Sequence, residues 1–421
     1  MSDSTKEKLK ILAGAAKYDV SCASSGSTRT NKGKGFGNTT YGGICHSFTE
    51  DGRCISLLKV MLTNHCINDC AYCVSRSSND IPRATFTVNE LVTLTSELYR
   101  RNYIEGLFLS SGVLKNADYT MERMVKVAKE LRSVHHYNGY IHLKAIPGAS
   151  DSLIYQAGLY ADRLSVNIEI ASEPNLKMLA PQKDFNSILT PMQAIKSGII
   201  QNKEERRKFR NAPRFSPAGQ STQLIIGATS DTDYQILDLA TNLYRGQNLK
   251  RVYYSGYLPL NTNDKRLPAI TAPPLKRENR LYQADWLFRF YQFSIDEIVN
   301  TTHPFLDLDI DPKLGYALRN PGIFPVDINR ADYGLLLRVP GIGPRSAQII
   351  VQSRRYGKLS SASLKKIGVV MKRARYFIVC NELPASSVLE LNPEIVKRQI
   401  LQSEMMANKL RKKQFIQLKL F

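Results

Sequence analysis

The sequence predicts an α/β fold in which parallel strands alternate with helices, followed by a small all-α module. Six short apolar runs recur over residues 56–254, separated by stretches in which apolar residues have helical spacing. Strand–helix alternation of this kind favours parallel strands joined by crossover helices. A concentration of basic residues over 327–380, around two short helical repeats, predicts the separate module. A chain of 421 residues is long enough for both.

The six predicted strands lie at intervals through the first 260 residues. They are residues 56–62, 106–109, 140–143, 164–168, 223–226 and 252–254. Between them, stretches such as 88–100 and 120–134 carry apolar residues three and four positions apart, which is typical of helices. We therefore expect a strand–helix domain over 51–260, preceded by an irregular Gly- and Ser-rich segment over 1–50.

Three cysteines within eight residues follow the first predicted strand. Cys66, Cys70 and Cys73 form a C-x3-C-x2-C motif, which differs from the C-x2-C-x2-C run of bacterial ferredoxins. Three thiolates can hold three irons of a 4Fe–4S cluster and leave the fourth iron open to a small molecule. The alternative is a structural zinc site completed by Cys54 or His65, although such sites usually show paired C-x2-C motifs.

The triplet, with Tyr72 before its last cysteine, resembles the motif of the radical S-adenosylmethionine (SAM) superfamily. The resemblance implies a partial (β/α)6 TIM-like barrel, a 4Fe–4S cluster on Cys66, Cys70 and Cys73, and SAM as cofactor. It also implies cleavage of SAM to a 5′-deoxyadenosyl radical that takes a hydrogen atom from a substrate. The electron would come from a reductase such as flavodoxin or ferredoxin. In barrels of this type the chemistry occurs at the C-terminal ends of the strands.

Residues at later strand ends match positions that contact SAM in that superfamily. The turn after the second strand departs from the common Gly-Gly-Glu but keeps small residues and hydroxyls for the methionine amino group. Asn167 and Glu169 are two apart, so their side chains share one strand face and suit the two ribose hydroxyls. A later strand would meet the adenine through its backbone. The implied SAM contacts are Tyr72, Ser110, Ser111, Gly112, Asn167, Glu169, Ile225 and Gly227.

Three further cysteines, Cys22, Cys45 and Cys54, precede the triplet. One of them could act as a hydrogen-atom donor to a substrate radical, as a cysteine does in spore photoproduct lyases. Together with His46 they could instead hold a second metal, or they could be small buried hydrophobes. Gly- and Ser-rich loops such as those around them line sites more often than cores.

Cysteine usage and the chain start bear on the compartment. Six of the seven cysteines lie within the first 73 residues, which is not a spread disulfide framework and suits a reducing compartment. The first residues are polar and contain no secretory signal. No apolar run approaches the roughly 18 residues needed to span a bilayer. We expect a cytoplasmic protein without a membrane segment.

The charge predicts a polyanionic partner. Lys and Arg number 58 against 37 Asp and Glu, a formal net charge of +21. A basic segment over 203–220 carries Arg206, Arg207 and Arg210 interleaved with Phe209 and Phe215. Guanidinium groups bind phosphates bidentately and aromatic rings stack on exposed bases. Such a segment at the barrel rim would steer a polymer toward the site; the alternative is a solvated helix face and a Pro-rich loop.

The second motif lies in the C-terminal third. A P-G-I-G turn joins two helical stretches, with Pro344 at the first position of the second helix. Glycines allow the tight turn, and the N–H groups of the new helix can bind a phosphate oxygen. The motif resembles a helix–hairpin–helix DNA-binding element, and residues 364–374 resemble a second copy without G-x-G. A tandem module over 326–381 implies sequence-independent binding of duplex DNA. The implied contacts are Gly341, Gly343, Arg345, Lys365, Lys366, Lys372 and Arg373.

The remaining segments are a connecting region over 261–325 and a basic tail over 382–421. The tail ends in a peptide that resembles the Q-L-x-L-F motif by which bacterial repair proteins bind the sliding clamp. The alternative is the last turn of an amphipathic helix. The residues of this peptide that would contact the clamp are Gln417, Leu418, Leu420 and Phe421.

As a whole, a barrel of this kind joined to tandem helix–hairpin–helix motifs resembles a family of radical SAM proteins assigned to DNA modification or repair. Members are often encoded beside a uracil-DNA-glycosylase-like protein, which the resemblance implies as a partner. Our hypothesis is a radical SAM enzyme that repairs a damaged or crosslinked base in DNA, or installs a modification. The alternatives are an RNA-modifying radical SAM enzyme and a non-catalytic Fe–S adaptor that binds DNA or the clamp.

Overall fold

A computed structural model of the chain describes residues 3–17, 44–48, 54–381, 383 and 392–417. The chain divides into two compact units. The first comprises residues 1–231 and 239–274, and the second comprises 232–238 and 275–421. In the described part of the chain, no helix combines the length and apolar composition that a membrane crossing requires.

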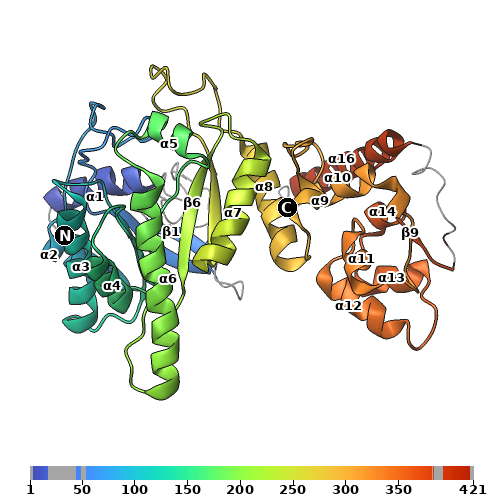
Figure 1. The fold of residues 1–421 in the computed structure, drawn as a ribbon, viewed down its shortest axis with the longest axis horizontal. Helices are drawn as coiled ribbons and strands as arrows, with labels where there is room; N and C mark the ends of the chain where they lie inside the picture. The colour runs from blue at the N-terminus through green and yellow to red at the C-terminus, as the bar shows by residue number, and fades with distance from the viewer. Residues whose placement is uncertain (1–2, 18–43, 49–53, 382, 384–391, 418–421) are drawn as a thin grey trace. The chain divides into compact units, whose positions relative to one another are not determined.

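The first unit is built on a seven-stranded sheet whose strands follow one another in chain order (Figure 1). Six strands are parallel and the first is antiparallel to the second. They are β1 Ile44–Phe48, β2 Cys54–Met61, β3 Gly106–Ser110, β4 Tyr140–Lys144, β5 Arg163–Ser165, β6 Gln220–Ile226 and β7 Arg251–Gly256. The predicted six-stranded parallel half-barrel is confirmed. β1 was not predicted, since its residues fall in the segment expected to be irregular.

Helices alternate with the parallel strands, and α1 precedes the sheet. They are α1 Asp3–Ala16, α2 Val88–Arg100, α3 Ala117–Ser133, α4 Asp151–Tyr160, α5 Glu173–Leu179, α6 Phe185–Lys208 and α7 Asp233–Gln247. Capping sets several starts: the Thr87 hydroxyl accepts the Glu90 N–H, and Asp184 accepts the Ser187 N–H. Apolar residues fill the sheet, and all five residues of β3 are buried. Because strands β2 to β7 are parallel, their carboxyl ends all lie at one edge of the sheet.

The second unit is mainly helical. Its elements are α8 Leu275–Phe290, α9 Ile295–Ile298, α10 Pro312–Arg319, the 3-10 turn η1 Pro321–Ile323, β8 Val326–Asp327, α11 Tyr333–Arg338, α12 Pro344–Ser353, α13 Ser361–Ile367, α14 Met371–Ala374, β9 Ile378–Val379 and α16 Pro393–Gln417. α11–α12 and α13–α14 form two consecutive helix–turn–helix units (Figure 1). The parallel pair β8–β9, in which Val326 lies opposite Ile378, joins the beginning of this module to its end.

Candidate functional site

The three cysteines of the triplet line one cavity of about 310 Å³. Polar and small residues at or just after the ends of the other parallel strands line the same space. They are Ser111 and Gly112 after β3, Lys144 at the end of β4, Asn167 and Glu169 after β5, Gln223 on β6 and Ser255 and Gly256 on β7. The structure thus brings together most of the residues predicted to contact a cluster and SAM, at the strand edge expected for barrel chemistry.

The donor set of this cavity fits a 4Fe–4S cluster. Cys66 and Cys73 are half-buried and Cys70 is buried, all on one short loop. Among the described residues, no three His, Cys, Asp or Glu side chains are arranged around a single metal ion. A cubane binds each cysteine to a different iron, so its ligands do not have to converge on one point. The exposed His65 is not among the residues that line the cavity.

Backbone carbonyls of the segment around the triplet are held by one guanidinium. Arg83 donates to the carbonyls of Asn64 at 2.5 Å and Ser75 at 2.8 Å, and to those of Arg76 at 2.6 Å and Asn79 at 2.8 Å. These acceptors lie before and after the cysteines in the sequence, so the guanidinium holds the two ends of the cysteine loop together. The planar fork of arginine suits several acceptors at once.

A second brace comes from far along the chain. The Asn261 side-chain amide donates to the carbonyls of Ala71 at 2.6 Å and Cys73 at 3.1 Å. Asp264 accepts from Arg76 at 2.5 Å and from Arg266 at 2.6 Å. These arginines hold the pKa of Asp264 well below its usual range, mainly through the Arg266 hydrogen bond. The carboxylate therefore stays charged and fixes the loop after β7 against the cysteine loop.

Gly112 is required by a close approach. A Cβ at this position would lie 2.3 Å from the carbonyl oxygen of His65, and the Gly112 N–H donates to Thr63 at 2.8 Å. The cysteine loop therefore packs directly on the turn after β3. Next to it, the Ser111 hydroxyl donates to the Gly112 carbonyl at 2.7 Å. The Ser110 hydroxyl is buried and has no hydrogen-bond partner within the described part of the chain.

Asn167 and Glu169 both line the cavity, but they follow the end of β5 at Ser165 and do not share a regular strand face as predicted. The Asn167 amide lies 3.5 Å from Glu169 Oε2 and 3.4 Å from Gln223 Oε1. Glu169 has a positive φ of 66°, which is unusual for a residue other than glycine. Its backbone nevertheless pairs with β6, where Ile225 N donates to Glu169 O at 2.7 Å. An uncommon backbone conformation is thus held in place where it aims a carboxylate into the site.

Lys183 places a half-buried cation in the cavity that the cysteines line. Its ammonium lies 3.5 Å from Glu169 Oε1 and 3.4 Å from the Tyr72 hydroxyl. Burial opposes the charged form, but the negative charges of the Cys70 thiolate and the Glu169 carboxylate outweigh burial and raise the pKa of Lys183. Burial also raises the pKa of Tyr72 and of Cys70, and that of Cys73 to about 12. Thiols in such surroundings ionise when a bound metal compensates their charge.

The sequence did not point to Lys183, Lys144, Arg83 or Asn261. Lys144 carried a usable signal, because it is a charged residue at the end of a buried strand run. Lys183 lies in the turn between α5 and α6, where no local pattern sets it apart. Arg83 and Asn261 donate to backbone carbonyls, which every residue has, so the sequence does not show which carbonyls they bind.

The remaining predicted residues of the first unit fall into two groups. Ile225 lines the cavity, whereas Gly227, with φ of 83°, is not among the lining residues. Cys22 lies outside the described residues. Cys45 and Cys54 lie in β1 and β2, opposite Leu57 and Phe48 respectively, and their side chains are outside the described part.

The prediction that the basic segment 203–220 lies near the site is wrong. Arg206 and Arg207 end α6, and the chain then enters β6 at its amino end, opposite the edge that carries the cavity. Arg210 follows in the same connection, on which Phe209 is 66% exposed. Phe215 is buried instead of free to stack on a base. It fills the space left by Gly158 and Gly198, where a Cβ would lie 2.1 and 2.5 Å from its ring.

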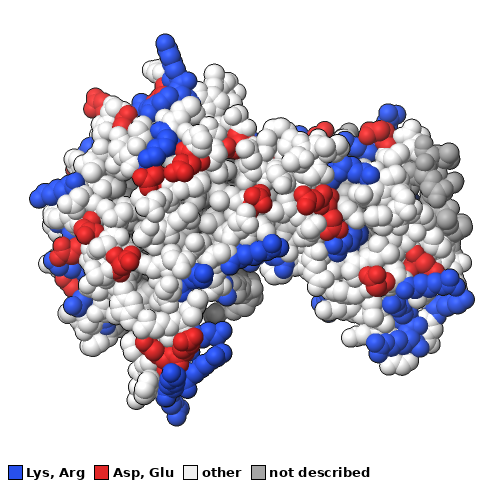
Figure 2. All heavy atoms as spheres, viewed as in Figure 1, with Lys and Arg blue, Asp and Glu red and all other residues white. Residues whose placement is uncertain are grey.

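The two turns of the helical module pack on each other. Gly341 has φ of 92°, and its carbonyl accepts the Val370 N–H at 2.9 Å. Gly343 is the N-cap of α12 and Gly368, with φ of 96°, ends α13. Figure 2 shows Lys and Arg gathered at the end of this unit that holds α12 and α13. The exposed basic residues on these helices and turns include Arg345, Lys365, Lys366 and Lys372.

Arg373 differs from these exposed residues. Its guanidinium lies 2.6 Å from Asp311 Oδ2 and 2.6 Å from Glu404 Oε1. Of the tail peptide, Gln417 is the last residue of α16, and its side chain is outside the described part. Leu418, Leu420 and Phe421 lie outside the described residues.

Comparisons with known proteins give structural neighbours only. No protein-family model matches the chain, and no curated protein matches it. The FeFe-hydrogenase maturase HydG from Carboxydothermus hydrogenoformans is 15% identical, covers 54% of this chain and 49% of its own, and has a TM-score of 0.42. Methylornithine synthase (PylB) is 12% identical over 66% of each chain, with a TM-score of 0.40.

Coproporphyrinogen III oxidase (HemN) from Escherichia coli, described as a radical SAM enzyme, is 15% identical. It covers 62% of this chain and 57% of its own, with a TM-score of 0.33. The chain thus spans about half the length of the maturase. With TM-scores below 0.5 and identities below 25%, these similarities assign no activity to the chain.

Proposed function

We propose that this chain is a radical SAM enzyme that acts on DNA. One observation carries the proposal: three thiols of one loop and polar residues from the ends of the other parallel strands line the same enclosed space. When bound, a 4Fe–4S cluster would supply the electron that cleaves SAM to a 5′-deoxyadenosyl radical. Cys66, Cys70 and Cys73 would hold three of its irons.

The chain's own residues would bind and orient SAM. Asn167 and Glu169 offer an amide and a carboxylate to the two ribose hydroxyls, and the uncommon backbone of Glu169 fixes its direction. The turn at Ser111 and Gly112 leaves room for the methionine end. Lys183 balances the negative charge of the thiolates and Glu169. The apolar strand residues beneath exclude water from the reacting atoms.

The enzymatic part is tested by product formation. Reduced, iron-reconstituted protein with SAM is expected to release 5′-deoxyadenosine, and Cys70→Ser is expected to abolish both the product and the iron. Cys380→Ser is the matched control, because Cys380 is a buried cysteine of the second unit. If fully reconstituted protein releases no 5′-deoxyadenosine, the enzymatic proposal fails.

The DNA part rests on the charge of the helical module. Eleven Lys or Arg and two Asp lie in residues 327–380, and several of the basic residues are exposed around the two turns. N–H groups at the start of α12 add phosphate donors. A target base within a duplex would be extruded to reach a barrel site, which suits repair or modification of single bases.

The DNA part has its own test. Lys365→Glu with Lys366→Glu is expected to weaken duplex binding and to reduce the slope of log affinity against log salt by about 2. Lys126→Glu, an exposed lysine of α3, serves as the control and should change neither by much. Equal affinity and slope in the double variant and the wild type would place the DNA contact elsewhere.

A further inference from the structure

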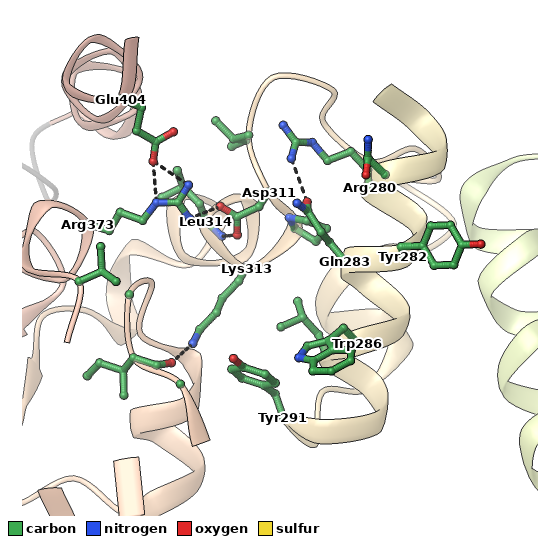
Figure 3. A pocket seen from close by; sticks show the side chains of 18 of the residues that line it. Arg280, Tyr282, Gln283, Trp286, Tyr291, Asp311, Lys313, Leu314, Arg373 and Glu404 are labelled. Carbon is green, nitrogen blue, oxygen red and sulfur yellow. Dashed lines mark hydrogen bonds and ion pairs between the residues drawn. The ribbon is translucent and has the colours of Figure 1, made fainter. Parts of the chain in front are cut away.

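A cavity of the second unit lies next to the first turn of the module. Its volume is about 700 Å³, within the range of about 300–1,000 Å³ typical of ligand sites. One wall is α8 and the other includes α10 and the turn at 341–343 (Figure 3). The resemblance to a helix–hairpin–helix does not account for this space, because α8 and α10 lie outside the module.

One stripe of α8 faces the cavity with exposed side chains. Asn279, Gln283 and Trp286 follow at helical spacing, and Trp286 is 49% exposed. The ring of Phe290 lies 4.3 Å from that of Trp286, centroid to centroid. Figure 3 shows Trp286 and Tyr291 beside one another on the α8 side of the space. A large exposed aromatic surface flanked by two amides is therefore held on one rigid helix.

The charged groups Arg373 and Lys313 of the opposite wall already have partners. Arg373 is bound by Asp311 and Glu404 at 2.6 Å each. Lys313 is 7% exposed, and its ammonium donates to the Ile342 carbonyl at 2.5 Å and lies 4.8 Å from the Tyr291 ring centroid. The wall thus offers little uncompensated charge to a phosphate. It suits a neutral, planar group with hydrogen-bonding edges.

The turn and the aromatic residues are adjacent. A Cβ at Gly343 would lie 3.4 Å from the Tyr291 hydroxyl. Lys313, which lines the cavity, donates to the carbonyl of Ile342 in the middle of the turn. A strand whose phosphate is bound at the turn would therefore carry its next nucleotide to the mouth of the cavity.

We propose that this cavity binds an unpaired nucleobase of a DNA strand held by the turn at 341–343, with Trp286 as the stacking platform. The inference rests on the proposed function only in that the turn binds DNA. It gives the module a preference for DNA with unpaired bases, such as an overhang, a bulge or an extruded nucleotide. Base–aromatic stacking predicts a preference of roughly 5- to 150-fold over a fully paired duplex.

The experiment measures the anisotropy of two fluorescein-labelled DNAs with the full chain: a paired duplex and the same duplex with a four-thymidine overhang. Wild type should prefer the overhang. Trp286→Ala should lose that preference and keep its affinity for the paired duplex, whereas Trp286→Phe should retain the preference. Tyr356→Ala is the control, because Tyr356 is 93% exposed and follows the far end of α12 from the turn. Trp286 is the only tryptophan of the chain, so its quenching by the overhang is a second readout.

Equal binding of both DNAs by wild type overturns the inference and leaves the proposed DNA binding intact. A preference that survives Trp286→Ala also overturns it. Failure to bind either DNA overturns both the inference and the DNA part of the proposed function. The enzymatic part is tested separately, by release of 5′-deoxyadenosine. Tighter binding of an RNA duplex with the same overhang overturns the assignment to DNA.

Discussion

Replacing Arg83 should disorder the cysteine loop without touching a cysteine. The guanidinium donates to four backbone carbonyls, two of which it reaches within 2.6 Å. Arg83→Met leaves all four carbonyls without this donor. Arg83→Lys keeps the charge, but a single ammonium on a flexible stem cannot reach four acceptors spread over the loop.

The expected loss follows from the hydrogen bonds. Bonds to a charged donor contribute about 1.5–3 kcal/mol each, so four independent ones would exceed roughly 6 kcal/mol. Arg83 is only half-buried, and water can replace part of the donation. We therefore expect Arg83→Met to lower the free energy of unfolding of the first unit by about 2–4 kcal/mol. Arg83→Lys should lose about half of that.

The assay combines urea unfolding with the iron content per chain after reconstitution. Both Arg83 variants should unfold at lower urea and hold less iron than wild type. Arg101→Met is the control, because Arg101 is 69% exposed and lies 3.4 Å from Glu97 on the surface. Exposed ion pairs of this kind contribute about 0–1 kcal/mol to the free energy of unfolding. Wild-type iron content together with an unchanged urea midpoint in Arg83→Met would contradict this role of Arg83.

Three further predictions follow from the same geometry. Gly112→Ala should lower the free energy of unfolding by about 3 kcal/mol and remove most of the bound iron, because the added Cβ would meet the His65 carbonyl. Gly246→Ala is the control, because a Cβ at that position has nothing within 4 Å. It should change neither the urea midpoint nor the iron content. Lys183→Met should make cluster reduction harder, because it removes a cation that stabilises the added electron. Potentiometry followed by electron paramagnetic resonance should show a more negative midpoint potential, and an unchanged one would contradict this. Burial lowers the pKa of Lys313 to about 7. The unfolded chain, with a lysine pKa of about 10.4, then binds more protons above pH 7, so stability should rise between about pH 7 and 10. Urea unfolding followed by Trp286 fluorescence should show this rise in wild type and a flatter profile in Lys313→Met; parallel profiles would contradict it.

The parts of the fold that follow from local patterns could be predicted from the sequence. Strands such as β3 are apolar runs buried on both faces, so their composition alone identifies them. The cysteine triplet and the Asn167–Glu169 pair are likewise short-range patterns. β1 contains Cys45, His46 and Ser47 and becomes a strand only because β2 offers it an edge. That partner cannot be inferred from the residues of β1.

Features decided by distant partners could not be predicted. Asn261 braces Ala71 across 190 positions of sequence, and no motif links an asparagine to a carbonyl. Phe215 sits among arginines in the sequence, which resembles a nucleic-acid contact. Its burial is decided by Gly158 on α4 and Gly198 on α6, which leave a hole of the right size. The direction of α6 similarly places the basic segment at the amino edge of the sheet.

The pairing of β8 with β9 bears on how this chain could change over time. Val326 and Ile378 are register partners, so the two ends of the intervening helical segment are neighbours in space. Neighbouring strands are about 4.8 Å apart, so the chain enters and leaves this segment within one strand spacing. Exchange of the segment between them would therefore not stretch the flanking chain, but it would remove the partners that Asp311, Lys313 and Glu404 have within it. A chain of this kind could exchange the segment in a single recombination event only together with matching changes on α10 and α16.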